Sequence, residues 1–439
     1  MSDLHVIVGL GETGLSCAHY LKKRGISFAI NDTRAAPPHL PEIKKYFPDI
    51  ELSLGKLDED LLERAAEIIL SPGLSLKEPA IAKQVSKGKS VIGDIELFVR
   101  ETTAPIIAIT GTNAKSTVTT LVGLMAERAG VKVKVGGNLG TPALDLLTEK
   151  NTELFVLELS SFQLETTHSL KAAVATVLNV TPDHMDRYEN VAAYQAAKKR
   201  IYKNCRVAVC NRDDVLTEDE NALRKFYFSL NEPNKNEFGI SKNFLAFENN
   251  LLLATRELPV LGKHYQANAL ASLAMGHAWG LPMDAMLQTL REFKGLPHRC
   301  QFVREINGVY WYNDSKGTNV GATLAAIEGL GSEITGKIIL IAGGLGKNAD
   351  FSLLTSAIKK YIKTLVLIGE AAPLLADVFK NEAEIVFANS MEEAVKKSFD
   401  HAKKEDLVLL SPACASWDMF KNFEHRGDVF TQAVLALKE

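Results

Sequence analysis

One short segment combines the residue types with which proteins bind phosphate groups. The apolar run Ile106–Thr110 leads into a turn of small and polar residues, Gly111-Thr112-Asn113-Ala114-Lys115-Ser116-Thr117. A turn of this kind between a strand and a helix points backbone N–H groups at phosphate, and the helix dipole favours negative charge. Lys115 would reach the terminal phosphates of a nucleotide, and the Ser116 hydroxyl would ligate Mg²⁺. The segment therefore predicts nucleotide binding; the alternative is an ordinary strand–helix junction with a surface lysine.

Two further polar positions follow strand-like runs. Glu158 stands at the end of the apolar run Leu154–Leu157, and His184 lies in the segment Thr181–Tyr188 that follows the run Ala173–Val180. The carboxyl ends of parallel strands line one crevice, so both side chains are expected near the phosphate turn. A carboxylate there suits Mg²⁺, whereas imidazole suits Mn²⁺ better. The alternatives are a solvated glutamate at a strand end and a hydrogen-bonded loop histidine.

A glycine pattern opens the chain. Gly9-Leu10-Gly11-Glu12-Thr13-Gly14 follows a strand-like run and fits a dinucleotide-binding turn, with Asp32 at the end of the second predicted strand. The pattern predicts a nucleotide or sugar nucleotide on the first domain. The alternative is a tight turn in a sheet that binds no nucleotide.

Three polar loops lie in the last third of the chain. They are Asn313–Asn319, which combines acid, base and hydroxyls, then Gly343–Lys347, which resembles an anion-binding turn, and Ser411–Trp417, which follows the last predicted strand. Together they predict a polar crevice on a third domain.

The elements that must position these residues follow from the apolar pattern. Short β-branched runs alternate with longer amphipathic stretches, which is typical of parallel sheets with crossover helices. The predicted strands form three sets: His5–Gly9, Ser27–Asn31, Ile68–Ser71 and Ser90–Ile92; Ile106–Thr110, Lys132–Val135, Leu154–Leu159, Ala173–Val180 and Arg206–Cys210; and Lys337–Ala342, Thr364–Ile368, Glu384–Ala388 and Asp406–Leu410.

Between these sets the pattern changes. Asn249-Asn250 is a plausible hairpin turn between Phe244–Phe247 and Leu251–Ala254, inside an antiparallel excursion, and Asn268–Trp279 is predicted as a helix. We therefore predict an α/β protein of three domains. Residues 1–93 form a Rossmann-like domain, 94–298 a central P-loop ATPase-type domain with the antiparallel excursion, and 299–439 a C-terminal Rossmann-like domain.

The bulk composition excludes several classes of function. A length of 439 residues suggests about three domains. The formal net charge is only −3, from 50 basic and 53 acidic residues, so neither nucleic acid nor an anionic membrane is expected as a partner. The five scattered cysteines indicate reduced thiols, and no apolar stretch reaches the roughly 18 residues of a membrane span. A strand-like run from His5 leaves no room for a signal peptide, so a cytoplasmic protein is expected, without membrane insertion.

Five segments resemble motifs of a known protein family. They are VGGNLG (135–140), LELSSFQLE (157–165), TPDHMDRY (181–188), NDSKGTN (313–319) and LSPACASWDMFKNFEHRG (410–427). Taken in this order, they resemble the Mur ligase family along essentially the whole chain, and within it the members that add D-glutamate to UDP-N-acetylmuramoyl-L-alanine in peptidoglycan precursor synthesis. The resemblance implies a domain for UDP, a central ATPase and a C-terminal domain for the amino acid, with ATP, UDP-N-acetylmuramoyl-L-alanine and D-glutamate as substrates. We also expect a monomer.

The resemblance also implies site residues. Family positions that hold the UDP-linked substrate match Glu12, Thr13, Asp32, Thr33, Arg34, Ser71, Pro72, Gly73, Asn138 and Ser160. Positions that contact ATP match Gly111, Thr112, Asn113, Ala114, Lys115, Ser116, Thr117, Asn268, Arg299 and Asp314. Positions around D-glutamate match His184, Lys316, Thr318, Lys347, Ser416, Trp417 and Phe423. The implied catalytic residues are Lys115, Asn138, His184 and Lys198, and the implied metal ligands are Ser116, Glu158, His184 and a carbamylated Lys198.

In the implied reaction, the γ-phosphoryl group of ATP moves to the L-alanyl carboxylate, and the amine of D-glutamate then attacks the acyl phosphate. Lys198 matches a lysine that the family carries as a carbamate formed from CO₂. A free lysine would place a cation beside Mg²⁺, whereas the carbamate is an anion that can ligate the metal. Mn²⁺ is expected to substitute for Mg²⁺. Domain closure would exclude water from the acyl phosphate, so a hinge is expected near residue 298.

The sequence departs from the family pattern at four positions. Ala114 replaces the glycine before the phosphate-binding lysine, Tyr265 an asparagine, Leu345 an aspartate, and Trp417 a common leucine. Weakened ATP binding with catalysis retained is the expected consequence of Ala114. Three alternatives stay open: a folylpolyglutamate synthase type of ligase, a dehydrogenase suggested by the first glycine pattern alone, and a degenerate nucleotide-binding protein.

Overall fold

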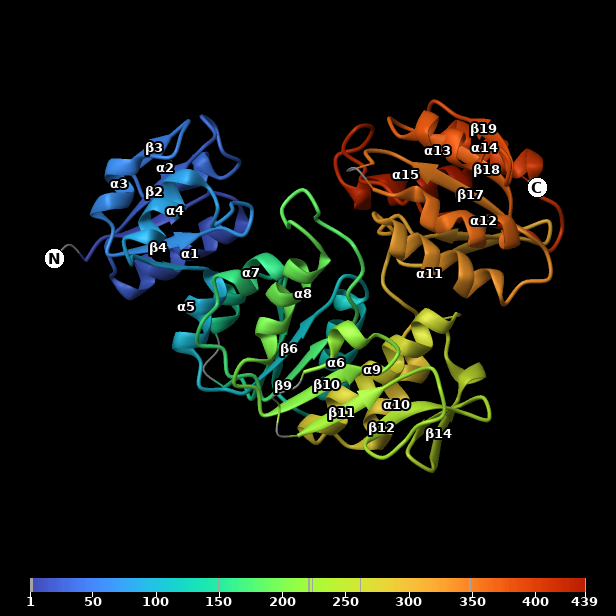
Figure 1. The fold of residues 1–439 in the computed structure, drawn as a ribbon, viewed down its shortest axis with the longest axis horizontal. Helices are drawn as coiled ribbons and strands as arrows, with labels where there is room; N and C mark the ends of the chain where they lie inside the picture. The colour runs from blue at the N-terminus through green and yellow to red at the C-terminus, as the bar shows by residue number, and fades with distance from the viewer. Residues whose placement is uncertain are drawn as a thin grey trace.

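Three parallel-rich β-sheets, each covered by helices, make up the computed structural model of this chain, which describes residues 3–148, 151–219, 222, 224–260, 262–346 and 349–438 (Figure 1). The sheets follow one another along the chain, from the blue first domain through the green centre to the orange and red third domain (Figure 1). The predicted α/β fold with three domains is thus confirmed.

The first sheet is parallel, with strand order β3-β2-β1-β4-β5. Its strands are β1 (His5–Val8), β2 (Phe28–Asp32), β3 (Leu52–Leu54), β4 (Glu67–Leu70) and β5 (Ser90–Ile92). The helices between them are α1 (Glu12–Arg24), α2 (Leu40–Tyr46), α3 (Glu59–Arg64) and α4 (Pro79–Ser86). The sequence did not predict β3, because three residues at a sheet edge make too short an apolar run to be recognised.

The central sheet has the order β14-β13-β12-β11-β10-β9-β6-β8-β7. Its strands are β6 (Ile106–Thr110), β7 (Val133–Gly137), β8 (Leu154–Glu158), β9 (Val174–Val177), β10 (Val207–Asn211), β11 (Lys225–Phe228), β12 (Glu237–Ser241), β13 (Phe244–Phe247) and β14 (Asn250–Ala254). The predicted hairpin of β13 and β14 is confirmed, but its turn is Glu248-Asn249 and not Asn249-Asn250, because Asn250 already pairs with Phe247. Strand β12 pairs with β13 in the same antiparallel manner. The strands β11 and β12 were missed, and they pair in parallel.

Helices cover this sheet on both faces. They are α5 (Asp94–Glu101), α6 (Lys115–Arg128), α7 (Ser161–Glu165), α8 (Val191–Lys199), α9 (Lys263–Trp279) and α10 (Met283–Glu292). The helix predicted over Asn268–Trp279 begins five residues earlier, at Lys263, because Gly262 with φ +101° turns the chain into it. The strand predicted over Ala173–Val180 ends at Val177, because the next residues bond to the phosphate turn instead.

The third sheet has the order β15-β16-β20-β17-β18-β19. Its strands are β15 (Gln301–Ile306), β16 (Val309–Asn313), β17 (Ile338–Gly343), β18 (Ile362–Ile368), β19 (Glu384–Phe387) and β20 (Leu407–Leu410), and its helices are α11 (Val320–Gly331), α12 (Thr355–Tyr361), α13 (Ala372–Phe379), α14 (Met391–His401) and α15 (Phe423–Ala436). The antiparallel hairpin of β15 and β16 was not predicted. Its turn is Asn307-Gly308, with φ of +53° and +77°, which is the strongest short hairpin signal that a sequence can carry.

The three domains are joined in different ways. One cluster of buried apolar side chains runs from the first domain into the central domain and includes Ile7, Phe98 and Phe155, with the last two rings edge to face at 4.9 Å. In the described part of the chain, the two apolar clusters of the third domain contain only residues from Cys300 onward. His298 and Cys300, with φ of +61° and +43°, flank Arg299 in the connection to that domain. No helix of the described residues is long and apolar enough to cross a membrane.

Candidate active site

The phosphate turn lies between the end of β6 and the first turn of α6. Ala114 is the N-cap of α6 and has φ +67° and ψ −6°, which is the left-handed region. A Cβ in this region costs about 1–2 kcal/mol relative to glycine. The replacement of the expected glycine by Ala114 therefore introduces strain into the turn.

Asn179, two residues beyond β9, holds the turn in place. Its carbonyl oxygen accepts a hydrogen bond from the Thr112 N–H at 2.9 Å, and its Oδ1 accepts one from the Asn113 N–H at 2.8 Å. The Thr112 hydroxyl and Thr181 exchange two further bonds, at 3.2 and 3.1 Å. Asn179 lies inside the strand predicted over Ala173–Val180 and was given no role from the sequence; a polar residue near the end of an apolar run was the available signal.

Two lysines converge on one carbonyl of the turn. Lys115 Nζ donates to the Gly111 carbonyl oxygen at 2.9 Å, and Lys198 Nζ donates to the same oxygen at 2.8 Å. Burial lowers the pKa of Lys198 well below its usual range, and the charge of Lys115 lowers it further. Burial likewise lowers the pKa of Lys115, and the nearby carboxylate of Glu158 opposes that shift. A buried amine with a depressed pKa spends more time neutral, which is the form that reacts with CO₂.

Glu158 lies at the end of β8, beside the turn, and is 2% exposed. Its Oε1 accepts from Asn138 Nδ2 at 2.6 Å, while its carbonyl accepts from the Asn138 N–H at 2.8 Å. Its Oε2 is buried and has no hydrogen-bond partner within the described chain. A buried carboxylate oxygen without a partner is costly unless a cation occupies it, so these residues fit a metal ion.

The donor set also fits a particular kind of metal. Across the described ranges, no group of three or more His, Cys, Asp or Glu side chains lies close enough to hold a metal ion. A site with one or two protein ligands suits Mg²⁺, which keeps several waters and binds substrate phosphates. Glu158 and the Ser116 hydroxyl are the residues that would hold it.

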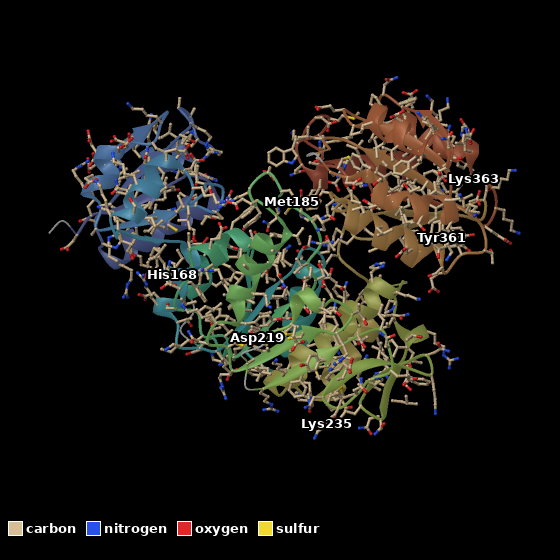
Figure 2. All side chains as sticks on the ribbon, viewed as in Figure 1. His168, Met185, Asp219, Lys235, Tyr361 and Lys363 are labelled. Carbon is tan, nitrogen blue, oxygen red and sulfur yellow. The ribbon has the colours of Figure 1, made fainter. Side chains whose placement is uncertain are left out.

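His184 begins a tight turn in the segment after β9, with φ +57°. Its ring lies edge-on to the ring of Phe162 from α7, at 4.9 Å between centroids, and 6.2 Å from the ring of Tyr194. Its Nε2 is 3.8 Å from the Asp183 carboxylate. Met185, the next residue, is 41% exposed and lies on the segment that extends between the first and third domains (Figure 2).

A cavity of about 300 Å³ lies between the central and third domains, next to the phosphate turn. Seven of the predicted ATP and amino-acid contacts line it: Asn113, Ala114, Thr117, Asn268, Arg299, Asp314 and Lys316. Tyr265 also lines it, with its ring stacked on Phe293 at 6.2 Å and 6°. The tyrosine that replaces the family's asparagine is therefore packed into the wall of the cavity.

Arg299 connects the third domain to the phosphate turn. Its guanidinium donates to the Ser116 hydroxyl at 2.8 Å. Burial lowers the pKa of Arg299, and Glu158 and Asp314 oppose that shift. Burial raises the pKa of Asp314 to about 6, although Asp314 accepts bonds from the Ser411 hydroxyl at 2.7 Å and the Cys300 N–H at 3.1 Å.

A second cavity, of about 320 Å³, lies on the first domain, and eight of the ten predicted UDP contacts line it: Glu12, Thr13, Asp32, Thr33, Arg34, Ser71, Pro72 and Gly73. The other two, Asn138 and Ser160, belong to the central domain, where Ser160 caps α7. Asp32 accepts from the Leu10 N–H at 2.7 Å and from Arg34 Nε at 2.9 Å and Nη2 at 2.7 Å. Burial raises the pKa of Asp32, but these bonds outweigh it and leave the pKa lowered.

The predicted amino-acid contacts other than His184 belong to the third domain. Lys316 Nζ lies 3.6 Å from the centroid of the Phe423 ring, and burial lowers the pKa of Lys316 to about 8. Ser416 is buried, and its hydroxyl has no partner among the residues that the structure describes. Trp417 beside it is 77% exposed. Thr318 lies in the same loop as Lys316, and Lys347 lies outside the described residues.

Two contacts of these loops were not predicted from the sequence. Leu345 pairs with Ala415 as an antiparallel bridge, with N–H···O distances of 2.9 and 3.0 Å, so its backbone holds the two loops together although the usual aspartate is absent. Asn319 donates to Asn113 Oδ1 at 3.2 Å and to Asp183 Oδ2 at 3.4 Å, which ties the third domain to the phosphate turn. Spacing alone could not reveal a contact between residues 206 positions apart.

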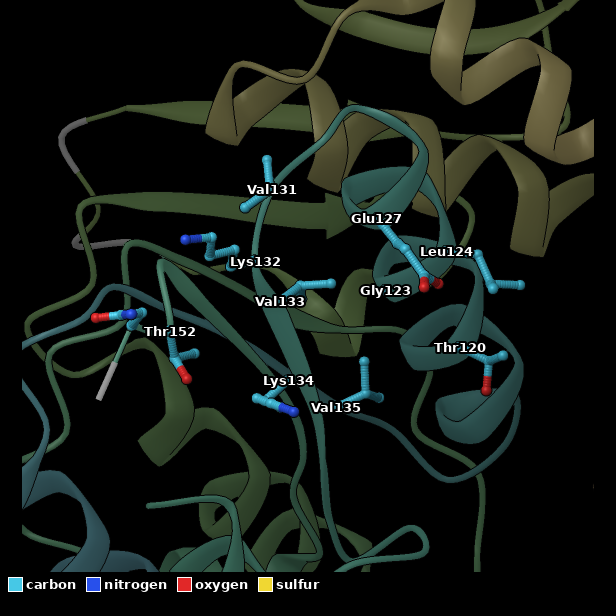
Figure 3. A pocket seen from close by; sticks show the side chains of 11 residues that line it. Thr120, Gly123, Leu124, Glu127, Val131, Lys132, Val133, Lys134, Val135 and Thr152 are labelled. Carbon is cyan, nitrogen blue, oxygen red and sulfur yellow. The ribbon is translucent and has the colours of Figure 1, made fainter. Parts of the chain in front are cut away.

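A further hollow of about 400 Å³ lies along the edge strand β7 and α6, and none of the predicted site residues is among the described residues that line it (Figure 3). Leu124, Val131, Val133 and Val135 supply aliphatic walls, while Lys134 lies on β7 and Lys132 directly precedes that strand (Figure 3). It is separate from the site described above.

Comparison with known proteins agrees with this geometry. Family models match three successive parts of the chain: the Mur ligase MurD-like N-terminal domain at residues 3–93, the Mur ligase middle domain at 109–276, and the Mur ligase glutamate ligase domain at 298–414. The chain belongs to the Mur ligase family. A relative from Pseudomonas syringae pv. tomato, named UDP-N-acetylmuramoylalanine--D-glutamate ligase, is 54% identical over 438 residues and covers 98% of each chain. A relative of the same name from Coxiella burnetii is 51% identical over 439 residues, with 99% of each chain covered.

Solved structures of Mur ligases share the fold. The UDP-N-acetylmuramate-alanine ligase of Thermotoga maritima has a TM-score of 0.62 at 17% identity and covers 99% of this chain and 100% of its own. A pseudomurein peptide ligase from Methanothermus fervidus has a TM-score of 0.60 at 18% identity, with 93% and 96% covered. The folylpolyglutamate synthase of Mycobacterium tuberculosis has a TM-score of 0.58 at 15% identity, with 75% and 91% covered. The architecture is therefore common to Mur ligases and folylpolyglutamate synthases, so the fold alone does not decide between these two kinds of ligase.

Proposed function

We propose that this chain is an ATP-dependent amide ligase that adds D-glutamate to UDP-N-acetylmuramoyl-L-alanine, with ADP and phosphate as the other products. The observation that carries the proposal is the identity of about half of all residues, over nearly the whole chain, with ligases of that name. A folylpolyglutamate synthase shares only the fold. The cavity at the glycine-rich start of the first domain also supports a uridine nucleotide rather than a folate.

The first step activates the carboxylate. An oxygen of the L-alanyl carboxylate attacks the γ-phosphorus of ATP, the bond to the β-phosphate oxygen breaks, and ADP leaves. Such a transfer needs positioning and charge stabilisation more than covalent chemistry. In this assignment the backbone of Gly111–Thr117 and the ammonium of Lys115 hold the phosphates, while Asn268, Arg299 and Asp314 are further contacts of ATP.

Mg²⁺, held by Glu158 and Ser116, would neutralise the phosphate charge in this step. Asn138 fixes the orientation of Glu158 through its 2.6 Å bond and thereby aims the remaining carboxylate oxygen. His184 is assigned beside the reacting carboxylate and as a further metal ligand. Mn²⁺ is expected to replace Mg²⁺, because imidazole is a better ligand for Mn²⁺.

We assign Lys198 as the site of a carbamate. The depressed pKa of its buried amine, 1% exposed, supports this assignment, because only the neutral amine attacks CO₂. The reaction joins the amine nitrogen to the carbon of CO₂, and a proton leaves to solvent. The product exchanges a cation for an anion next to Lys115 and so relieves the repulsion between the two lysines.

The second step forms the amide. The amine of D-glutamate attacks the acyl carbon, phosphate leaves, and the ammonium proton is lost. Lys316, Thr318, Lys347, Ser416, Trp417 and Phe423 are assigned to D-glutamate, and the buried hydroxyl of Ser416 supports a ligand there. The first-domain cavity, with Asn138 and Ser160 further along, is assigned to the UDP-linked substrate.

We divide the chain into a substrate domain at 1–93, an ATP domain at 94–298 and an amino-acid domain at 299–439. The left-handed residues His298 and Cys300 support a hinge at the second boundary. We further infer that the protein acts as a monomer in the cytoplasm, where ATP and its UDP-linked substrate occur.

Phosphate release tests the proposal. The purified chain would be given ATP, Mg²⁺, bicarbonate and UDP-N-acetylmuramoyl-L-alanine, with D-glutamate, L-glutamate, lysine or no amino acid. Release that requires both substrates and prefers D-glutamate would support the assignment. Folded protein that releases no phosphate with any amino acid would refute it and favour a degenerate nucleotide-binding protein.

A further inference from the structure

Arg187 and His184 belong to one turn. The His184 carbonyl oxygen accepts from the Arg187 N–H at 3.0 Å and from the Tyr188 N–H at 3.1 Å. The turn is closed by these two bonds and by the left-handed conformation of His184. A displacement of Arg187 therefore moves His184, which is assigned beside the reacting carboxylate.

The Arg187 guanidinium reaches out of the central domain into the first. Nη1 donates to the Pro72 carbonyl oxygen at 2.6 Å, and Nη2 donates to the Leu74 carbonyl oxygen at 2.9 Å. Nη2 also donates to Glu165 Oε2 at 3.1 Å, and the guanidinium carbon lies 4.0 Å from the centroid of the Phe162 ring. The Arg187 side chain is only 14% exposed. Charge-assisted bonds from a planar, largely buried guanidinium hold their acceptors in one geometry.

The two accepting carbonyls lie in the wall of the first-domain cavity. Ser71, Pro72, Gly73 and Leu74 all line that cavity, after the end of β4. Ser71 ties the start of this wall to the opposite one, because its hydroxyl donates to the Gly9 carbonyl oxygen at 2.9 Å. Arg187 holds the other end of the same wall. The wall therefore connects the cavity directly to the turn that carries His184.

In the central domain, the ring of Phe162 packs against residues of the His184 turn. Its ring stacks on that of Tyr188 at 5.9 Å and 17°, and lies edge-on to that of His184. Arg187, Tyr188 and His184 are thus packed around one aromatic ring from α7. The arrangement leaves little freedom for the His184 turn once the guanidinium is fixed.

We propose that Arg187 is a positioning residue that couples occupancy of the first-domain cavity to the placement of the His184 turn. A uridine nucleotide in the cavity orders the wall of residues 71–74, the wall fixes the guanidinium, and the guanidinium fixes the turn at the reacting carboxylate. This inference rests on the proposed function for the identity of the nucleotide. It goes beyond that function by assigning a role to a residue that is not among the predicted ATP, UDP, amino-acid or metal contacts and is not among the described residues that line either cavity.

The chain offers a matched control. Lys77 and Glu189 form a second ion pair between the same two domains, at 2.9 Å, but both side chains are largely exposed. An exposed pair contributes little. Glu189→Gln removes that pair without touching the cavity wall, whereas Arg187→Met removes the guanidinium and keeps the aliphatic stem. Arg187→Lys keeps the charge, but it cannot donate to both carbonyl oxygens as the guanidinium does. This variant replaces Arg187→Met in the test if Arg187→Met does not fold.

Hydrogen–deuterium exchange of the full-length chain with UDP as the probe tests the coupling. In the parent protein, UDP should slow amide exchange in peptides that cover residues 70–76 and in those that cover 181–190. In Arg187→Met, UDP should still slow exchange at 70–76 but no longer at 181–190. UDP binding should weaken about tenfold, as expected for the loss of charged hydrogen bonds. The turnover number should fall while the KM for ATP stays unchanged, and Glu189→Gln should behave as the parent protein.

Equal protection of residues 181–190 by UDP in the parent protein and in either Arg187 variant would overturn the proposal. A parent protein that binds UDP but forms no amide with D-glutamate would refute the proposed function instead, and the exchange result would still decide the coupling. Failure of the parent protein to bind UDP would overturn both.

Discussion

Lys115 and Lys198 donate hydrogen bonds to the same acceptor, the Gly111 carbonyl oxygen, at 2.9 and 2.8 Å. Two ammonium groups that share one acceptor repel each other, and burial strengthens the repulsion. Each lysine therefore influences the protonation of the other. The pair links the phosphate-binding turn to the residue assigned as a carbamate.

Removal of the Lys115 charge should make carbamate formation at Lys198 harder. In Lys115→Met the pKa of Lys198 should rise, because the repelling charge that lowers it is gone. The neutral amine then forms only at higher pH, so the carbamate signal in ¹³C NMR with labelled bicarbonate should appear at higher pH than in the parent protein. Lys199→Met, on the next residue of α8, should leave the signal unchanged. An unshifted signal in Lys115→Met would show that the two lysines are not coupled.

Ala114→Gly should relieve strain in the phosphate turn. Because Ala114 has φ +67°, glycine should raise the free energy of unfolding by about 1 kcal/mol and lower the KM for ATP. Ala129→Gly is the control at the other end of α6, where φ is −75°. Glycine there relieves nothing and should cost about 0.5–1 kcal/mol of stability. Urea unfolding and ATP titration of the two variants would measure both effects, and an unchanged KM in Ala114→Gly would contradict the expectation.

Binding of D-glutamate should depend on pH through Lys316. Burial lowers the pKa of Lys316 to about 8, so the ammonium loses its charge as pH rises through 8. The KM for D-glutamate should therefore rise between pH 7 and 9.5, because a neutral amine attracts a carboxylate only weakly. In Lys316→Arg the charge persists, so KM should stay nearly flat over the same range. Parallel pH profiles for the two proteins would rule out this role.

Asp94, at the start of α5, should make the fold less stable at neutral pH. Burial raises its pKa to about 6, against 3.8 for an ordinary aspartate. Between pH 4 and 6 the folded chain holds a proton that the unfolded chain has released, so the free energy of unfolding falls as pH rises through this interval. Asp94→Asn still accepts the bond from Gln163, and it should be more stable than the parent protein at pH 7.5 by on the order of 2 kcal/mol.

Urea unfolding at pH 4 and pH 7.5 checks the effect of Asp94. The difference between the two proteins should become small at pH 4, where the folded carboxyl is protonated and the carboxyl of the unfolded chain is close to its ordinary pKa of 3.8. Asp60→Asn, which removes one carboxylate from the exposed first turn of α3, is the control substitution. A constant gain at both pH values would mean that the effect of Asp94→Asn does not arise from protonation.

The hinge at residue 298 should allow the third domain to close. Asn319 contacts Asn113 and Asp183 across the domain boundary, and Arg299 contacts Ser116. Small-angle scattering should show a smaller radius of gyration with ATP and UDP-N-acetylmuramoyl-L-alanine than without them. Asn319→Ala should weaken that compaction, and an unchanged radius on ligand addition would count against a hinge.

The phosphate turn and Glu158 could be predicted because their signals are local. A strand, a small-residue turn and a helix start lie within twelve residues, and the apolar run of β8, which pairs with β6, ends at the acid. The wall of the first-domain cavity was predicted from the resemblance, residue by residue, and the structure brings eight of those residues together.

Contacts between distant segments could not be predicted in this way. Arg187 reaches Pro72 across 115 positions, and nothing near either residue indicates the other. Strand β3 was missed because it is short, and the hairpin of β15 and β16 was missed although its Asn307-Gly308 turn was readable. The replacement of a glycine by Ala114 was visible in the sequence, but its left-handed conformation is known only from the structure.

The division of the buried apolar side chains into separate clusters predicts how the chain unfolds on heating. The first and central domains share one cluster, so each loses part of its interior when the other melts, and they should melt together as a single cooperative unit. The third domain has its own clusters from Cys300 onward, as far as the chain is described, and can melt by itself. A calorimetric scan of the ligand-free chain should therefore contain two endotherms. A ligand that contacts both the central and the third domain should bring the two transition temperatures closer together.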